Sequence, residues 1–181
     1  EHQWELVWDE IYTSQGIVQS GVLEPVKNFV EMLKENGVKH VLDLGCGTGR
    51  NTVYMAQKGL HVTASDISEK GLDLTNKKAK KLGYNIETSR HDMRNMPFKE
   101  NTFDAILCSW VCGHGTHEDM VSQANEMLRV LKPGGLIFVD YPSTEDDLYG
   151  VGNEVAQNTF LNNVPGEEKI PHHYSDEEEI R

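Results

Sequence analysis

Long apolar runs are missing from this sequence of 181 residues. No stretch approaches the roughly 20 continuous apolar residues that a membrane-spanning helix needs. The amino end also lacks the basic region and following apolar run that are typical of signal peptides. We therefore expect a soluble cytoplasmic protein without a membrane partner.

Cysteine is scarce, and Cys46, Cys108 and Cys112 form an odd set without regular spacing. Such a set does not build a disulfide framework, so we expect free buried thiols. Thiolate and imidazole are zinc ligands, but the chain has no paired C-x-x-C motif. We therefore expect no metal site from these cysteines or from the histidines near them in the predicted fold, which are His114, His117, His172 and His173.

Basic residues are few compared with acidic ones. The chain has 17 Lys and Arg against 29 Asp and Glu, which gives a formal net charge of -12. This charge repels phosphate backbones and disfavours DNA or RNA as a partner. The one dense basic run, K-K-A-K-K at 77–81, is typical of a solvent-exposed helix face. We expect a monomer or homodimer that acts on a small molecule.

Apolar periodicity predicts short strands that alternate with single helices. The predicted strands are 39–44, 60–65, 85–90, 103–111 and 136–141, and the predicted helices are 22–33, 51–58, 68–82 and 120–131. This alternation indicates a doubly wound α/β fold, with a mostly parallel sheet and helices on both faces. The inner faces of the last two helices are predicted to carry Leu72, Thr75, Ala79 and Leu82, and Met120, Ala124, Met127, Leu128 and Leu131.

The chain is expected to form a single domain with three parts. Residues 1–37 form an N-terminal lid or helix, residues 38–141 form a cofactor-binding core, and residues 142–181 form an insertion with a truncated carboxyl part. Residues 142–174 are polar, acidic and contain Gly and Pro, so we expect a surface insertion with some helix near 152–160. Both ends of the sequence look like cut edges.

The stretch V-L-D-L-G-C-G-T-G-R, residues 41–50, leads a strand into a loop in which Gly45, Gly47 and Gly49 alternate. Alternate glycines let the backbone approach a ligand beyond the carboxyl end of the strand. A dinucleotide-binding G-x-G-x-x-G loop needs glycine at the position of Arg50, and Asp43 would repel a pyrophosphate. An acid there suits the ammonium and sulfonium charges of S-adenosylmethionine.

Two further acids follow the next strands. Asp66 ends the second strand, about 20 residues past the first, where a carboxylate can accept both hydroxyls of a ribose. Asp92 follows the third strand, where it can accept the exocyclic amine of adenine while the Met93 amide meets a ring nitrogen. The alternative interpretations are a surface acid before the Ser68 helix cap and a loop acid facing water.

Four motifs over residues 38–141 resemble the class I S-adenosylmethionine-dependent methyltransferases. They are V-L-D-L-G-C-G-T-G, A-S-D-I-S, H-D-M-R-N-M-P-F-K-E-N-T-F-D-A-I and L-R-V-L-K-P-G-G-L-I-F-V-D. The resemblance implies a Rossmann-like, three-layer α/β/α fold with strand order 3-2-1-4-5, and methyl transfer by in-line displacement. The short stretches G-C-G-T-G-R-N and V-Y-M-A are also similar to small-molecule methyltransferases of the tellurite-resistance and thiopurine kind.

The resemblance also implies an antiparallel hairpin after the fifth strand, and this chain stops before it. The fifth strand would then be an exposed apolar edge, which favours pairing with other chains. We therefore expect either a fragment of a longer polypeptide or a second chain that covers this edge.

By the same resemblance, the methionine end of the cofactor contacts Asp43 and the glycine loop, and the backbone of Cys108 lies near the sulfonium. Asp66 takes the ribose, and Asp92 with Met93 takes the adenine. The complete predicted cofactor-binding set is Tyr12, Asp43, Gly45, Cys46, Gly47, Gly49, Asn51, Asp66, Ile67, Asp92, Met93 and Cys108.

Methyl transfer from a sulfonium mainly requires alignment of the reactants and exclusion of water. For an oxygen acceptor of high pKa, a general base is helpful, and His114 in V-C-G-H-G-T-H-E-D is the candidate. His114 can also be a solvent-facing loop residue, and His117 can simply begin the next helix. Enzymes of this family that methylate amino groups of nucleic-acid bases carry an Asp/Asn-Pro-Pro-aromatic stretch, where this chain has C-S-W-V-C-G.

The amino segment contains Trp4, Trp8 and Tyr12 at helical spacing. These side chains can pack as part of the core. Alternatively, as in similar methyltransferases, the segment folds over the cofactor as a lid, with Gly16 as its hinge and Tyr12 reaching the methionine carboxylate.

The sequence thus predicts S-adenosylmethionine-dependent methyl transfer to a small-molecule acceptor, with His114 as the candidate catalytic residue. Two other functions remain open at this point. One is a non-catalytic domain that binds S-adenosylmethionine or S-adenosylhomocysteine. The other, disfavoured by Arg50 and by the acid in the first strand, is an NAD-dependent oxidoreductase.

Overall fold

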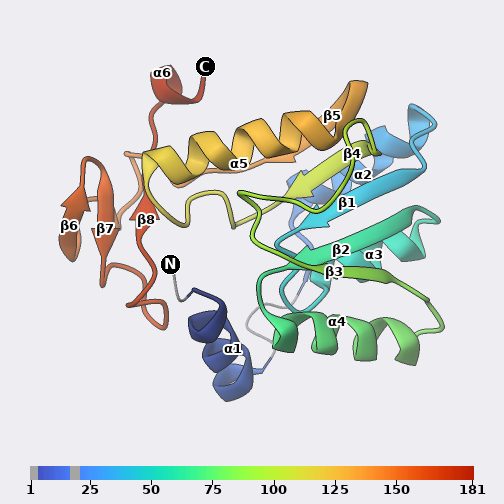
Figure 1. Cartoon of the computed structure of the whole chain (residues 1–181), viewed down its shortest axis with the longest axis horizontal. Helices are drawn as coiled ribbons and strands as arrows, with labels where there is room; N and C mark the ends of the chain where they lie inside the picture. The colour runs from blue at the N-terminus through green and yellow to red at the C-terminus, as the bar shows by residue number, and fades with distance from the viewer. Residues whose placement is uncertain (1–3, 17–20) are drawn as a thin grey trace.

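The computed structural model describes residues 4–16 and 21–181. Figure 1 shows a central sheet between helices, with a smaller sheet beside it and α1 below. The helices are α1 (Trp4–Gln15), α2 (Glu24–Glu35), α3 (Arg50–Gln57), α4 (Glu69–Lys81), α5 (His117–Val130) and α6 (Glu177–Ile180). The strands are β1 (His40–Leu44), β2 (His61–Asp66), β3 (Glu87–Arg90), β4 (Phe103–Cys108), β5 (Leu131–Val139), β6 (Asn153–Ala156), β7 (Thr159–Leu161) and β8 (His172–His173).

The five strands of the large sheet are parallel and lie in the order β3-β2-β1-β4-β5. Val41 is level with Val62 on one side and with Ala105 on the other. This order confirms the predicted Rossmann-like fold. It also places the order reversal between β1 and β4, which is where doubly wound sheets bind their ligands.

Two apolar clusters fill the space between the sheet and its helices. On one face, Val30 of α2 and Met55 of α3 pack against Val41 and Leu107 of the sheet. On the other face, Leu42 and Ile106 belong to the cluster that includes Met127 of α5. Successive residues of a strand point to opposite faces, so the nearly continuous apolar runs of β1 and β4 supply both clusters.

The periodicity misplaced two side chains. Leu82 and Leu128 were predicted to face inward, but they are 49% and 64% exposed. Leu82 lies just past the end of α4, and Gln123, Met127 and Val130 carry the buried stripe of α5 instead. The buried stripe of each helix is narrower than the predicted inner face, and Leu82 and Leu128 lie outside it.

Two strand boundaries also differ from the prediction. The strand expected over 103–111 ends at Cys108, because Trp110 adopts a left-handed φ of 60° that a strand does not accommodate. Asp140 holds this bend by accepting a hydrogen bond from the Trp110 amide at 2.5 Å and one from the Ser109 hydroxyl at 3.0 Å. β5 begins at Leu131, earlier than expected, and ends at Val139.

The helix expected near 152–160 is wrong. This segment forms the antiparallel hairpin of β6 and β7, with Asn158 at φ 54° in the turn, and β8 pairs with β7 to complete a small sheet. The small sheet is not merely superficial, since Phe160, Ile170 and Tyr174 are buried. An Asn in the left-handed region is a typical turn signal, and here it outweighs the weak helical pattern.

No helix among residues 4–16 and 21–181 is long and apolar enough to cross a membrane.

Candidate functional site

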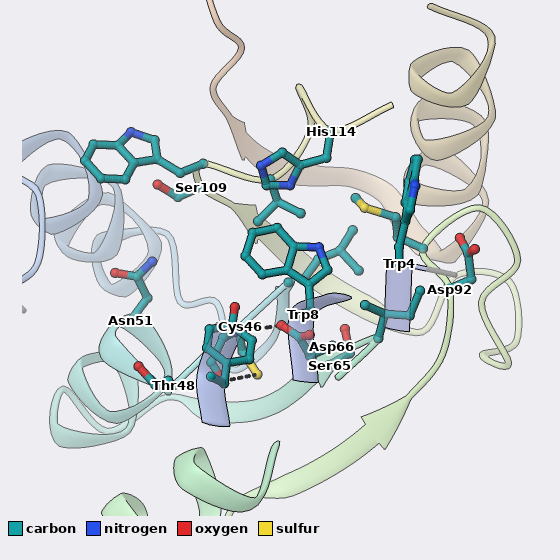
Figure 2. Close-up of a pocket in the computed structure, with 18 of the residues that line it drawn as sticks. Trp4, Trp8, Cys46, Thr48, Asn51, Ser65, Asp66, Asp92, Ser109 and His114 are labelled. Atoms are coloured by element: carbon teal, nitrogen blue, oxygen red, sulfur yellow. Dashed lines mark hydrogen bonds between the residues drawn. The ribbon is translucent and has the colours of Figure 1, made fainter. Parts of the chain in front are cut away.

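One pocket opens beyond the carboxyl ends of β1, β2 and β4. It contains about 1040 Å³ of unfilled space, including the part open to solvent. Figure 2 shows Trp8 in the middle of the pocket, between His114 and Asp66 in the view. Ten residues of the predicted site line it, namely Tyr12, Gly45, Cys46, Gly47, Asn51, Asp66, Ile67, Asp92, Met93 and His114. The remaining three, Asp43, Gly49 and Cys108, do not line this pocket.

The glycine loop adopts a shape that other residues cannot follow. Gly45, Gly47 and Gly49 have φ values of 71°, 54° and 79°. A Cβ atom on Gly45 would lie 2.5 Å from a methyl group of Val111, and one on Gly47 would lie 3.0 Å from the Tyr12 hydroxyl. The alternating glycines therefore serve both the left-handed backbone and close approach at the pocket.

Asp66 is buried at the end of β2, with 8% of its surface exposed. Its Oδ2 accepts a hydrogen bond from the Gly47 amide at 2.8 Å, and its Oδ1 accepts one from the Ser68 amide at 2.9 Å. Burial raises the pKa of Asp66 to about 6, although these amides favour the ionised form. Each carboxylate oxygen keeps a free lone pair, so Asp66 can still accept hydrogen bonds from a ligand.

Asp43 lies beneath the glycine loop. Its Oδ2 accepts a hydrogen bond of 2.5 Å from the hydroxyl of Thr52 in α3, and burial raises its pKa to about 6. In this position Asp43 ties the first turn of α3 to β1. It contributes negative charge to the pocket floor without lining the pocket itself.

Asp92 lines the pocket but is already engaged by Arg94. The guanidinium of Arg94 donates to both oxygens of Asp92, at 2.5 to 3.1 Å, and to Asp119 at 2.7 Å. The same guanidinium lies over the ring of Trp4, 4.9 Å from its centroid. Arg94 thus connects the loop after β3, the start of α5 and the amino-terminal helix at one side of the pocket.

Helix α1 covers the pocket with aromatic side chains. Trp8 stacks on Tyr12 with 5.7 Å between ring centroids and lies 5.0 Å from the His114 ring. Burial and the neighbouring Asp66 charge raise the pKa of Tyr12 well above its usual value, so its hydroxyl stays protonated as a donor. Ile11 is the buried residue of α1. The helix therefore combines packing with cover over the site, and Gly16 follows it at φ 67°.

His114 reaches the pocket from the loop after β4. Its Nε2 lies 3.4 Å from Oε2 of Glu167, and Nε2 of His172 lies 2.9 Å from the same oxygen. Burial lowers the pKa of His114 despite the nearby carboxylate. The imidazole is therefore neutral near pH 7, as a general base must be.

Cys108 lies behind the pocket. Its Sγ is 2.8 Å from that of Cys112, and all three cysteines are free and buried, as expected. His117 is the first residue of α5. It follows Thr116, the N-cap residue, which forms a capping box with Asp119.

Several pocket residues were missed by the sequence reasoning, among them His91, Gln123 and Glu167. Gln123 and Glu167 come from segments without a recognised motif, and only folding brings them to the site. His91 begins the motif H-D-M-R-N-M-P-F-K-E-N-T-F-D-A-I, but no role was predicted for it. The H-D pair at 91–92 is the one local signal, because it places His91 beside a predicted ligand. Burial lowers the pKa of His91 to about 4, so its ring is neutral.

Unpaired polar atoms point to a polar ligand. Among the described residues, five buried side-chain polar atoms lack a hydrogen-bond partner, and three of them, Asn51 Oδ1, His91 Nε2 and Gln123 Oε1, belong to residues that line this pocket. Buried polar groups are seldom left unpaired, because each costs about 1–3 kcal/mol. These residues and the Asp66 carboxylate give the pocket a polar lining.

Comparison with known proteins decides the family. The methyltransferase domain family matches residues 41–135, which contain the glycine loop, β2 to β4 and all of β1 except His40. The chain belongs to the methyltransferase domain family. This result confirms the resemblance seen in the sequence motifs.

This methyltransferase domain is 33% identical over 129 residues to phosphoethanolamine N-methyltransferase 1 of Arabidopsis thaliana, covering 70% of this chain and 26% of that protein. A solved S-adenosylmethionine-dependent methyltransferase from Methanosarcina mazei superposes with a TM-score of 0.71 at 22% identity, over 88% of this chain and 81% of that one. The magnesium protoporphyrin IX methyltransferase of Synechocystis, solved with bound S-adenosylhomocysteine, has a TM-score of 0.54 at 26% identity, over 69% of this chain and 61% of that one.

The methyltransferase domain described here spans from about a quarter to just over half of the length of the curated relatives that it matches first.

Proposed function

We propose that this chain transfers a methyl group from S-adenosylmethionine to a small-molecule acceptor by in-line displacement. The observation that carries the proposal is the single pocket in which the glycine loop, the Asp66 carboxylate and the His114 imidazole meet. S-adenosylmethionine as the cofactor is supported by the family match and by related methyltransferases solved with that molecule or its demethylated product. A small acceptor is supported by relatives named for phosphoethanolamine and demethylmenaquinone.

The cofactor, when bound, supplies an activated methyl group. In the proposed arrangement Asp66 binds the ribose hydroxyls, and the loop residues Gly45 and Gly47 admit the methionine end close to the backbone. Asp92 and Met93 lie at the adenine end. The Trp8 and Tyr12 rings exclude water from above, which strengthens the charge interactions inside the pocket.

The proposed base is His114, with Glu167 as its positioning residue. When Nε2 carries the proton and faces Glu167, Nδ1 is free to accept a proton from the acceptor. The resulting imidazolium lies beside the Glu167 carboxylate, whose pKa is held at about 2 by its contacts with His114 and His172 against the effect of burial. Glu167 therefore stays ionised and stabilises the charge that forms.

The test is formation of S-adenosylhomocysteine from S-adenosylmethionine with a panel of alcohols, phenols, amines and thiols. We expect turnover with at least one class, and for an oxygen acceptor His114→Gln lowers kcat by about 10²-fold or more with unchanged cofactor affinity. His61→Gln is the matched control. His61 is exposed and lies at the start of β2, at the other end of the strand from Asp66, so this variant should leave kcat unchanged.

Glu167→Gln separates positioning from a purely structural role. Removing the carboxylate lowers the pKa of His114 further, so the acid limb of the kcat profile moves to lower pH while kcat falls. Cofactor binding without turnover on any acceptor would instead identify a non-catalytic binding domain. Unchanged kcat in His114→Gln with an oxygen acceptor would show that His114 is not the general base.

A further inference from the structure

A second cluster of histidines lies outside the pocket, where three elements meet. His117 begins α5, His173 lies in β8 and Glu179 lies in α6. Figure 1 shows the start of α5 close to β8, with α6 above them. His117 Nδ1 is 2.6 Å and His173 Nε2 is 2.9 Å from the same carboxylate oxygen, Oε1 of Glu179. All three potential ligand atoms lie within 4.8 Å of one another.

The second ring nitrogen of His173 also has a hydrogen-bond partner. Its Nδ1 lies 2.8 Å from the hydroxyl of buried Thr159 in the neighbouring strand β7. Histidines that bind metals almost always have such a partner on the second ring nitrogen, because it fixes the tautomer and the ring orientation. The His173 side chain is 2% exposed, whereas that of His117 is 53% exposed, so the cluster is anchored inside and open to solvent outside.

The local charge favours a cation. Residues 176–179 are four consecutive acids, and Glu118 follows His117 in the first turn of α5. The carboxylate of Glu179 and the imidazoles of His117 and His173 thus converge in a negative environment.

The sequence predicted no metal site at these histidines, because Glu179 meets them only in the fold. From the geometry we propose that His117, His173 and Glu179 bind a divalent transition-metal ion, with Zn²⁺ as the preferred ion and water in the open position. Two imidazoles and one carboxylate form a ligand set that suits zinc, whereas Mg²⁺ and Ca²⁺ prefer oxygen ligands alone. At a metal–ligand distance of about 2.1 Å, tetrahedral ligand atoms lie about 3.4 Å apart. Exposed His117 and the short helix α6 leave room for this small expansion of the cluster.

The metal site holds structure and takes no part in methyl transfer. It joins the start of α5 to β8 and α6, which lie more than 50 residues further along the sequence. His172, the neighbour of His173 in β8, contacts Glu167 at the pocket wall. An ion on one side of β8 would therefore stabilise the wall on the other side.

Three clusters of His and Glu that could hold a metal ion occur among the described residues. Variants in each cluster can therefore show which one binds the ion. The other clusters are His114, Glu167 and His172 at the pocket wall, and His40, His61 and Glu87 on the large sheet. The experiment is calorimetric titration of the chelator-treated chain with Zn²⁺, and separately with Mg²⁺, together with thermal unfolding. The variants are His117→Ala and Glu179→Gln in the proposed site, Glu167→Gln and His61→Ala in the other clusters, and Glu178→Gln as the exposed neighbour of Glu179.

We expect one equivalent of Zn²⁺ to bind, no heat from Mg²⁺, and a rise in Tm of about 5 °C with zinc in excess. His117→Ala and Glu179→Gln should each lower zinc affinity at least about tenfold and abolish the rise in Tm, while the other three variants behave like the parent chain. Absence of zinc binding, parent-like binding by His117→Ala, or a loss that follows Glu167→Gln or His61→Ala would each overturn the assignment. Because zinc binding is measured without cofactor or acceptor, its outcome is independent of whether the chain methylates.

Discussion

Asp66 has to satisfy the folded chain and a ligand at the same time. Its two oxygens already hold the amides of Gly47 and Ser68, and thereby fix the glycine loop against the start of α4. Burial raises its pKa from 3.8 to about 6. The free protein consequently favours the protonated form of Asp66 at mildly acid pH, whereas the ribose hydroxyls of the proposed cofactor donate to the carboxylate and favour its ionised form.

Cofactor affinity should therefore depend on pH. Since the bound cofactor lowers the pKa of Asp66, affinity is constant above about pH 7 and falls as the pH drops below about 6, by at most about tenfold per unit for this group. Calorimetry with S-adenosylhomocysteine from pH 5 to 8 measures this slope. Asp66→Asn should bind more weakly at pH 8 and show a flatter profile, and a profile as steep as that of the parent chain would contradict the assignment to Asp66.

The folding of the free protein responds to pH in the opposite sense. The folded chain binds the Asp66 proton more tightly than the unfolded chain, so the contribution of Asp66 to stability is greatest below about pH 4. This contribution is lost as the pH rises through about 6. A bound cofactor that lowers the pKa of Asp66 offsets the loss. The same sign applies to Asp43, whose pKa is also about 6 because of burial.

The three acids also show what a sequence pattern can and cannot predict. Their positions after successive strands were predicted, and Asp66 and Asp92 line the pocket. Asp43 instead lies under the loop, since side-chain direction alternates along β1 and its carboxylate meets Thr52. Gln123 and Glu167 were not predicted, because their proximity arises only from contacts between distant segments. His91 was overlooked although it is the neighbour of Asp92 in the sequence.

Helix α1 is attached to the core through Asp9. Its Oδ1 accepts hydrogen bonds from the Ser68 hydroxyl and from the Lys70 amide, the latter at 3.1 Å, at the first turn of α4. Ser68 in turn caps α4 through the Gly71 amide. An acid at this end also interacts favourably with the helix dipole. One side chain thus stabilises α4 and positions Trp8 and Tyr12 over the pocket.

Asp9→Ala should loosen this cover. We expect a loss of about 1 kcal/mol of stability, faster amide exchange in α1, and several-fold weaker cofactor binding. Glu10→Ala is the control, because Glu10 makes only a surface ion pair with Lys169 at 3.4 Å, in which both side chains are 70% exposed. Equal exchange rates in the two variants would show that Asp9 does not hold the helix.

Elements were predictable where one pattern dominated. β1, α3 and β2 were found because their apolar runs are bounded by Gly45, Gly59 and Ser68. The hairpin of β6 and β7 was not found, because its strands are short and their polar residues do not alternate clearly. The large sheet therefore follows from local sequence, while the small sheet depends on contacts such as the bridge between His114 and His172.

At the scale of the whole molecule, three distant segments enclose one site. The pocket receives Trp8 from α1, Asp66 from the large sheet and Glu167 from the segment before β8. A ligand that contacts all three stabilises the folded chain as a unit. Its effect on thermal unfolding is therefore a sensitive measure of fit.

S-adenosylmethionine and S-adenosylhomocysteine should each raise the Tm, by about 5–10 °C at a hundredfold excess over Kd. NADH should not, because Arg50 replaces the third glycine of a dinucleotide-binding loop and the acidic floor of the pocket repels a pyrophosphate. Differential scanning fluorimetry with the three compounds at equal concentration provides the comparison. Stabilisation by NADH alone would favour the oxidoreductase function instead.

The two adjacent histidines of β8 face opposite sides, His172 toward the pocket wall and His173 toward α5 and α6. Their pairing with Phe160 and Thr159 fixes which one faces which side. Shifting this strand by a single residue would exchange every partner on both sides. The length of the connection between β7 and β8 is therefore under tighter constraint than its composition, so that deleting one residue from it should be far more damaging than replacing several.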